Sequence, residues 1–472
     1  MSEASATAFV AQQAGRFREV AFRNFSLSKP VWETLAVVAL CPVLLSAAIW
    51  NGFPLIFYDT GAYMLQSFGL KFVPERSPVF SIFLLVAGGD VSLWLVAVVQ
   101  TLMASFVMVE TARAVAPRIT LPILLAIGVV LTLLTGLPWY AGQIEPDIFT
   151  PLVVLCLYLL AFHPAELGRG RSAALVIIAA LSTAMHPSHL GLGVGLALLL
   201  VGYRLFVAWR KKPWPSIDIT RPISAALLGL SLVLAGNYIY TGRMFVSRAG
   251  PVFMFARMLQ DGVVQRLLNE TCPTSNYMLC RYRTALPHRA DKWLWGPGSL
   301  FVKLHRFIGT EKESAKIVHD SLARYPAWNA ELAARDAWQQ FTLFYTGDQI
   351  EPQQWILFWD FHKFIPDQLR AYDNARQQKG ELHFRPLNYI HVPVGGIILL
   401  MLLAGLVLAI RRRDLAAAPL LGFILAALIG NAIICGVFSN PHARYQSRLI
   451  WVPAFALALL AVDRRTAALR PS

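Results

Sequence analysis

Ionisable residues gather where apolar segments of this chain end, and their types would suit a reaction site. The main candidates are Asp59, Glu145, Asp147, His186, His189, Arg444 and Arg448. Ionisable groups are costly at membrane depth and tend to be kept for function or for pairing. A carboxylate near an apolar boundary can take a proton from a hydroxyl group, and an imidazole can act as acid or base near neutral pH. A guanidinium group binds phosphate through parallel hydrogen bonds.

Asp59 lies in the segment FYDTGAY, a few residues past the first apolar run. One interpretation makes it a general base or a ligand of a divalent cation. The other makes it a helix cap, with Gly61 aiding a turn. Two neighbouring features favour the first interpretation, and they are an aromatic frame (Phe57, Tyr58, Tyr63) and the element Glu75-Arg76-Ser77-Pro78.

Glu145 and Asp147 flank a proline in GQIEPDIFT, at the start of another apolar run. A proline followed by an acid is typical of a helix start, so capping explains Asp147 taken alone. Two acids at an otherwise uncharged turn exceed what capping needs. We therefore expect both to orient an acceptor or to bind a metal ion.

His186 and His189 share the short turn HPSH between two apolar runs. Each could donate a hydrogen bond to a phosphate oxygen or transfer a proton. A single histidine at a helix end is usually an ordinary surface residue. Two in one turn shift the interpretation modestly towards substrate binding.

Arg444 and Arg448 lie in SNPHARYQSRLIW, at the entry to the last apolar run. Arginine at this end of a span runs against the positive-inside bias, so it needs a partner. The partner could be a lipid headgroup, an acid such as Glu145, or an anionic substrate. Arg243 and Arg248, just past another apolar run, could face the same anion.

The composition predicts the element type that positions these residues. The chain has 472 residues, of which 56% are hydrophobic and 15% charged, with a mean hydropathy of +0.52. Long apolar runs with few charges indicate transmembrane helices, so we expect an all-α, polytopic helical bundle. The ten expected spans are 33–50, 90–112, 118–136, 148–163, 172–186, 188–208, 221–240, 389–410, 415–437 and 447–463.

Basic residues set the expected orientation. The net charge of +15 falls largely in short loops between apolar runs, which is the pattern of positive-inside asymmetry and not of nucleic-acid binding. Alternation then sends one set of basic clusters to the cytoplasm, namely Arg113/Arg118, Arg169/Arg171, Arg210/Lys211/Lys212, Arg411/Arg412/Arg413 and Arg464/Arg465. Both termini are expected there too, in a bacterial-type inner membrane.

This topology divides the chain into four parts. They are a cytoplasmic leader (1–32), a transmembrane module (33–240) with an outer loop of catalytic type (51–89), a periplasmic helical subdomain (241–386), and C-terminal helices with a short cytoplasmic tail (387–472). Within the subdomain, Thr310 and Glu313 have the spacing of a capping box. The segment QQWILFWDFHKFI (353–365) has an aromatic density that suits either the lipid headgroup layer or a small-domain core.

Cys272 and Cys280 are the only cysteine pair close in sequence, and both fall in the expected periplasmic subdomain. Disulfides persist outside the cytosol, so we predict a disulfide here. Metal binding is the weaker alternative, because the spacing matches no common zinc pattern.

The sequence lacks the motifs GxxxxGK[ST], HExxH and GxSxG, which argues against a nucleotide-driven pump, a zinc protease of that type and an elbow-type hydrolase. A substrate that is already activated and reached from the bilayer fits better. Polyprenyl-phosphate sugars have such a headgroup, a leaving phosphate and a tail that lies between helices.

The arrangement resembles the polyprenyl-phosphate-sugar-dependent glycosyltransferases of the GT-C fold. The resemblance covers roughly 30–240 and 390–463 and rests on the acid of the first outer loop, the basic-proline element at 75–78, Pro146-Asp147, and ARYQSR. It implies that Asp59 is a base or metal ligand and that outer basic residues hold the lipid phosphate. Many members have two adjacent acids where this chain has Asp59 and Thr60. This departure argues against metal dependence and leaves Asp59 as a single base, with a divalent cation as the alternative.

The sequence therefore predicts an inner-membrane glycosyltransferase of the cell envelope, with Asp59 as base. Arg76, Arg444 and Arg448 would grip the phosphate, while Glu145, Asp147, His186 and His189 would contact a periplasmic glycan or lipid acceptor, or a metal ion. Membrane lipids are the other expected partner. Two alternatives are a lipid-linked glycan flippase or other secondary transporter, and a non-enzymatic envelope assembly factor. Charges clustered at one end, without an inverted repeat, favour the enzyme.

Overall fold

The computed structural model describes residues 29–210, 217–272 and 274–468. Most of the leader predicted for 1–32, and the basic pair Lys211/Lys212, lie outside these residues. In the described part of the chain the regular structure is helical, as the apolar periodicity predicts. An isolated β-bridge joins Leu55 to Gln143.

Six stretches of helix among the described residues are long and apolar enough to cross a membrane. They are α6 (Leu93–Val115), α11 (Pro187–Arg210), α12 (Thr220–Thr241), α21 (Phe384–Arg411), α22 (Ala417–Val437), and the stretch Arg444–Thr466 that contains α23 (Arg444–Ser447) and most of α24 (Trp451–Ala468). The four other predicted ranges also fall on helices, which are shorter: α2 (Lys29–Leu44), α7 (Leu121–Leu134), α9 (Phe149–Phe162) and α10 (Arg169–Ala184).

Helix α9 lies at the centre of the bundle. Its residues from 149 to 161 are all buried, because α6, α10, α11 and α22 pack around it. A helix that is apolar on every side is stable only when it is enclosed in this way. The short 3-10 helix η1 (Pro146–Ile148) leads directly into α9, so Glu145 and Asp147 sit at the end of the central helix.

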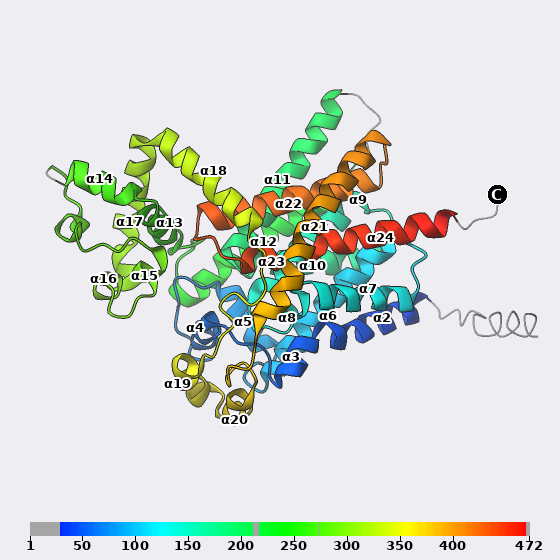
Figure 1. Cartoon of the computed structure of the whole chain (residues 1–472), viewed down its shortest axis with the longest axis horizontal. Helices are drawn as coiled ribbons and strands as arrows, with labels where there is room; N and C mark the ends of the chain where they lie inside the picture. The colour runs from blue at the N-terminus through cyan, green and yellow to red at the C-terminus, as the bar shows by residue number, and fades with distance from the viewer. Residues whose placement is uncertain (1–28, 211–216, 273, 469–472) are drawn as a thin grey trace, which may run out of the picture.

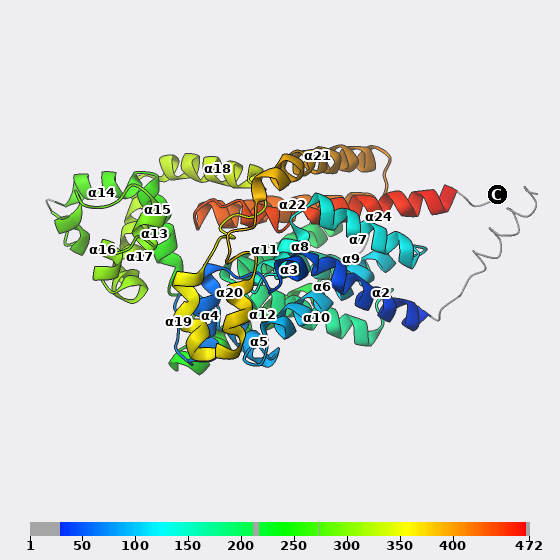
Figure 2. The same ribbon diagram turned by 60° about the horizontal axis from the view of Figure 1, so that its bottom comes forward.

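Partly buried ion pairs tie three helix ends together at the opposite end of α9. Glu33 of α2 accepts ion pairs from Arg113 of α6 and Arg171 of α10, and Glu110 of α6 pairs with the same two arginines. The two basic residues predicted to share the cytoplasmic side therefore share one end of the bundle. The starting end of α2 and the final end of α24 both lie to the right in Figures 1 and 2.

The region predicted as one subdomain (241–386) divides into two parts. A lobe at the left of Figure 1 has its own hydrophobic core and contains α13 (Gly250–Gln260), α14 (Val263–Thr271), η2 (Met278–Tyr282), α15 (Ala290–Leu294), α16 (Leu300–Lys303) and α17 (Arg306–Arg324). Helix α18 (Pro326–Thr342) runs from this lobe along α22. In contrast, α19 (Gln354–Phe364) and α20 (Pro366–Asn374) place Leu357, Phe361 and Tyr372 in the core of the bundle.

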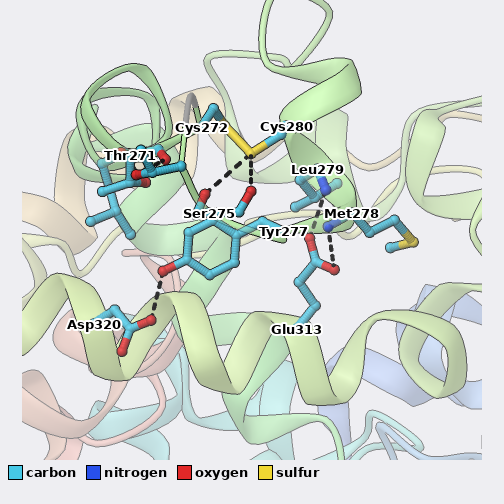
Figure 3. The surroundings of a disulfide bond; sticks show 11 residues. Thr271, Cys272, Ser275, Tyr277, Met278, Leu279, Cys280, Glu313 and Asp320 are labelled. Carbon is cyan, nitrogen blue, oxygen red and sulfur yellow. Dashed lines mark hydrogen bonds between the residues drawn. A yellow bond between two sulfur atoms is a disulfide. The ribbon is translucent and has the colours of Figure 1, made fainter.

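The predicted disulfide between Cys272 and Cys280 is present, with a Cα–Cα distance of 5.3 Å. Figure 3 shows how α17 holds the loop that the disulfide closes. The backbone N–H groups of Met278 and Leu279 donate to the Glu313 carboxylate of α17, and the Tyr277 hydroxyl donates to Asp320 of the same helix. Glu313 is therefore not part of a capping box. Helix α17 begins earlier, at Arg306, and Glu313 is used between elements.

Four short helices complete the part of the fold that surrounds the predicted site. They are α3 (Ser46–Asn51), α4 (Tyr58–Ser67), α5 (Pro78–Val86) and α8 (Leu137–Ala141). Helix α5 is apolar, but its 9 residues are too few to cross a bilayer. Ser77 caps it by accepting a hydrogen bond from the Val79 N–H, and its hydroxyl donates to the carbonyl of Ala184 at the end of α10.

Candidate functional site

An extended segment before α4 brings the first outer loop to the start of the central helix. The Leu55 N–H donates to the Gly142 carbonyl, and the Ile144 N–H donates to the Leu55 carbonyl, both at 2.9 Å. On the other side, the Gln377 side chain accepts from the N–H of Ile56 and donates to its carbonyl. Both flanks of the segment are thus fixed, so Asp59 and Glu145 become neighbours.

Asp59 lies in the first turn of α4 between two arginines from distant parts of the chain. Arg76 donates to Oδ1 of Asp59, and Nη2 of Arg444 lies 3.8 Å from Oδ2. The Asp59 side chain is 16% exposed, whereas both arginines are buried. The Arg444 guanidinium also lies over the Phe57 ring, 4.2 Å from its centroid. Oδ2 is therefore the freer oxygen of this carboxylate.

Glu145 is buried beside Asp59. The Thr60 hydroxyl lies 3.4 Å from Oε1 of Glu145 and 3.1 Å from the Ile144 carbonyl. Burial, followed by the nearby charge of Asp59, raises the pKa of Glu145 well above its usual range, and Arg444 offsets this only partly. A carboxyl group in this setting holds its proton to a higher pH than a solvent-exposed glutamate does.

Asp147 pairs with Arg448, and this pair leads to the histidine turn. Nη1 of Arg448 lies 2.6 Å from Oδ1 of Asp147, and Nη2 donates to the Ser188 hydroxyl at 3.3 Å. Nδ1 of His186 lies 2.8 Å from the same hydroxyl and accepts from the Ser188 N–H. Burial, and then His189 and Arg448, lower the pKa of His186 well below its usual range. Its imidazole is therefore neutral at pH 7.

Two of the predicted site residues have other partners, and a third is exposed. Both ring nitrogens of the buried His189 are engaged, with the Thr150 hydroxyl at 2.6 Å and the Ser182 carbonyl at 3.1 Å, so it is a core histidine. Arg248 pairs with Glu311 of α17 and joins the lobe to the bundle, instead of facing an anion beside Asp59. Arg243 is exposed past the end of α12.

Several buried guanidinium nitrogens in the cluster lack a hydrogen-bond partner. They are Nη1 of Arg444, Nε of Arg76 and Nε of Arg448. An unsatisfied buried donor costs free energy, and each is a place where a ligand could supply an acceptor. The same guanidinium groups pair with the Asp59 and Asp147 carboxylates. Their unpaired N–H groups are thus the part of the cluster that an anion could bind.

A small pocket with a largely apolar lining lies next to Arg76. Its cavity volume is about 20 Å³, and Arg76 is the charged residue in its lining. The apolar lining includes Pro78, Pro187, Leu190, Val233, Phe245 and Val246. A guanidinium beside an apolar pocket suits a molecule with an anionic head and an apolar tail.

The structure adds residues that sequence reasoning did not select. Asp348 accepts from the Arg444 backbone N–H at 3.2 Å and lies 3.6 Å from the His442 ring, so it fixes the segment that carries Arg444. Asn431 of α22 accepts from Arg448. Asn431 could have been selected from the sequence, because it is a polar residue within an apolar span. Asp348 could not, because no sequence pattern in its loop distinguishes it.

The acids of the cluster that could have been metal ligands are paired with arginines. Asp59 and Asp147, which the sequence left open as cation ligands, each pair with an arginine. Among the described residues no group of three or more His, Cys, Asp or Glu side chains is placed to hold a metal ion. The cluster is instead suited to an anion.

Comparison with known proteins gives no relative: no family model, no curated protein and no solved structure matches this chain.

Proposed function

We propose that this chain is an integral membrane glycosyltransferase that moves a sugar from a polyprenyl-phosphate donor to a periplasmic or lipid-linked acceptor. The observation that carries the proposal is the position of Asp59 between Arg76 and Arg444, two buried guanidinium groups that each keep an unpaired N–H. In this arrangement Asp59 can act as the base, and the guanidinium groups on its two sides can bind an anion close to it.

In the proposed reaction the acceptor hydroxyl meets Oδ2 of Asp59, the freer oxygen. The hydroxyl oxygen forms a bond to the anomeric carbon of the sugar, and its proton passes to Asp59. The bond between that carbon and the donor phosphate breaks, and the phosphate leaves with the electron pair. The unpaired N–H groups of Arg76 and Arg444 then bind the charge that develops on the leaving oxygen.

The topology is part of the proposal. We place the site at the periplasmic face of an inner membrane crossed about ten times, with both termini in the cytoplasm. The short helices α2, α9 and α10 cross in the company of the six longer stretches, because their ends meet at the same charged clusters as the long ones. Helix α7 crosses with them because it packs against α2 and α24. The pocket beside Arg76 would take the start of the prenyl chain.

The direct test uses purified protein in proteoliposomes with polyprenyl-phosphate hexose and pentose donors labelled in the sugar. The assay supplies an extract of envelope glycans and lipids as acceptors. It measures the release of free polyprenyl phosphate and the transfer of labelled sugar to the acceptors. We expect Asp59→Asn to lower transfer by about 100-fold or more, in the range of lost general-base catalysis. Asp367→Asn, which alters an exposed acid in the first turn of another short helix, α20, is the control.

A separate measurement locates the phosphate site. Arg444→Gln should weaken binding of unlabelled polyprenyl phosphate, whereas Asp59→Asn should leave that binding intact. Transfer at the wild-type rate by a normally expressed Asp59→Asn protein would remove Asp59 from the reaction. Movement of the donor across the bilayer without release of polyprenyl phosphate would instead identify a flippase.

A further inference from the structure

Helix α19 presents an aromatic face that the proposed reaction does not use. Trp355 and Trp359 are 94% and 72% exposed, one helical turn apart, and Ile356 is also exposed. His362 and Lys363 continue the same side of the helix. Free water is a costly environment for two tryptophan rings on one surface, so the face has the composition of a contact surface.

The opposite face of α19 is fully packed, which fixes the direction of the tryptophans. Leu357 and Phe361 are buried in the bundle core, and the Phe361 ring stacks on Tyr372 of α20 with 4.0 Å between centroids. Rotation of the helix to bury Trp355 would expose these residues. The packing of Leu357 and Phe361 therefore keeps the two tryptophans on the outward face of α19.

Hydrogen bonds place the α19–α20 hairpin at the ends of the apolar helices. The N–H of Leu93, the first residue of the candidate span α6, donates to Gln368 of α20 at 2.9 Å. Arg376, just past α20, donates to the carbonyl of Trp50 at the end of α3. In Figures 1 and 2 α19 and α20 lie side by side next to α4. The hairpin thus lies at the level where apolar helices emerge.

Helix α19 is too short to cross a bilayer. Its 11 residues extend about 16 Å, about half of a hydrocarbon core of about 30 Å. Tryptophan is enriched at the headgroup layer, where its ring is partly apolar and its N–H can donate to lipid or water. A lysine on the same side can reach anionic headgroups.

We propose that α19 lies along the outer membrane interface, with Trp355 and Trp359 inserted among lipid headgroups and Lys363 directed to anionic lipid. Helix α19 in turn holds α4. A Cβ at Gly61 would lie 2.6 Å from Oδ2 of Asp360 in α19, so side chains of α19 pack directly against the backbone of α4 just after Asp59. Membrane contact by α19 therefore sets the depth of Asp59 relative to the headgroups.

The test measures the surroundings of α19 without any assay of activity. Trp355→Cys and Trp359→Cys are each labelled with a polarity-sensitive fluorophore in nanodiscs that contain anionic lipid. The control is His319→Cys, whose parent side chain is 83% exposed in the lobe. The native free cysteines are buried, so labelling is confined to the new thiol.

We expect the labels at 355 and 359 to emit at shorter wavelength than the label at 319. Nitroxide lipid with the spin label at the headgroup should quench them, and aqueous iodide should quench them less than the label at 319. Equal iodide quenching at all three positions, without quenching by nitroxide lipid, would overturn the proposal and leave this face to a water-soluble partner. Trp355 and Trp359 are exposed, so each variant keeps the packed side of α19 intact.

Discussion

Arg448 and Asp147 form an ion pair inside the bundle: their Nη1 and Oδ1 atoms are 2.6 Å apart, and 1% and 2% of the two side chains are exposed. The residues are 301 positions apart in sequence. Arg448 precedes α24, and Asp147 precedes the central helix α9. The pair therefore fixes the last helix of the chain against the helix on which the candidate site is built.

Removing one partner of this pair should strongly destabilise the protein. Asp147→Asn leaves the Arg448 guanidinium buried and uncompensated, which costs about 3 to 5 kcal/mol. Thermal unfolding in detergent should show a large fall in Tm. Arg464→Gln, which breaks the exposed pair with Asp414, should cost less than about 1 kcal/mol.

A double variant separates charge from packing at the same position. Asp147→Leu combined with Arg448→Met removes both charges and keeps apolar volume, so it should be more stable than Asp147→Asn alone. A double variant that is less stable than the single one would show that the wider network through Ser188 and Asn431 holds the structure, and not the pair.

Glu145 should make stability fall as pH rises. Its pKa is raised above the usual 4.5 by burial and then by Asp59, so the folded protein keeps a proton that the unfolded chain releases. Where the folded state binds more protons, the free energy of unfolding decreases with increasing pH, starting at about pH 4.5. The Glu145→Gln variant lacks this titrating carboxyl group and its contribution to the pH dependence. Its Tm relative to wild type should therefore increase between about pH 5 and pH 8; parallel Tm curves would contradict the raised pKa.

The sequence predicted the elements of the bundle well, because apolar runs and basic clusters are local patterns. Each predicted range coincides with a helix, and Arg113 and Arg171 meet the same two acids. The sequence also predicted that Asp59 and Arg444 share one end of the bundle, since each lies at the outer end of a span. That the two side chains meet, with Nη2 of Arg444 3.8 Å from Oδ2 of Asp59, is a finding of the structure.

What could not be predicted depends on contacts between distant segments. Gln377 fixes Ile56 from 321 residues away, and nothing around Gln377 marks that role. Arg248 was selected by its position after a span, but a partner in the lobe, Glu311, competes for it. The division of 241–386 arises in the same way, because only packing shows that Leu357 belongs to the bundle.

The disulfide should stabilise the lobe and leave the bundle unaffected. Cys272 and Cys280 are 8 positions apart, and closing so short a loop contributes about 2 to 3 kcal/mol. Because the lobe has its own core, Cys272→Ser with Cys280→Ser should raise hydrogen exchange in η2 and α17, while α9 stays protected. Reductant should produce the same change in wild type and none in the double variant. Faster exchange in α9 would show that lobe and bundle unfold together.

A side chain at Gly61 would have to displace the ends of two side chains of α19, against which α4 packs. A Cβ at this position would meet Oδ2 of Asp360 at 2.6 Å and Cδ2 of Leu357 at a still shorter distance. Gly61→Ala should therefore cost about 1 to 3 kcal/mol by overpacking. It should also lower the proposed transfer activity, since Asp59 lies in the same helix. At Gly195 in α11 a Cβ would meet nothing within 4 Å, so Gly195→Ala should leave both Tm and transfer unchanged. Similar Tm values for the two variants in nanodiscs would contradict the close packing of α4 on α19.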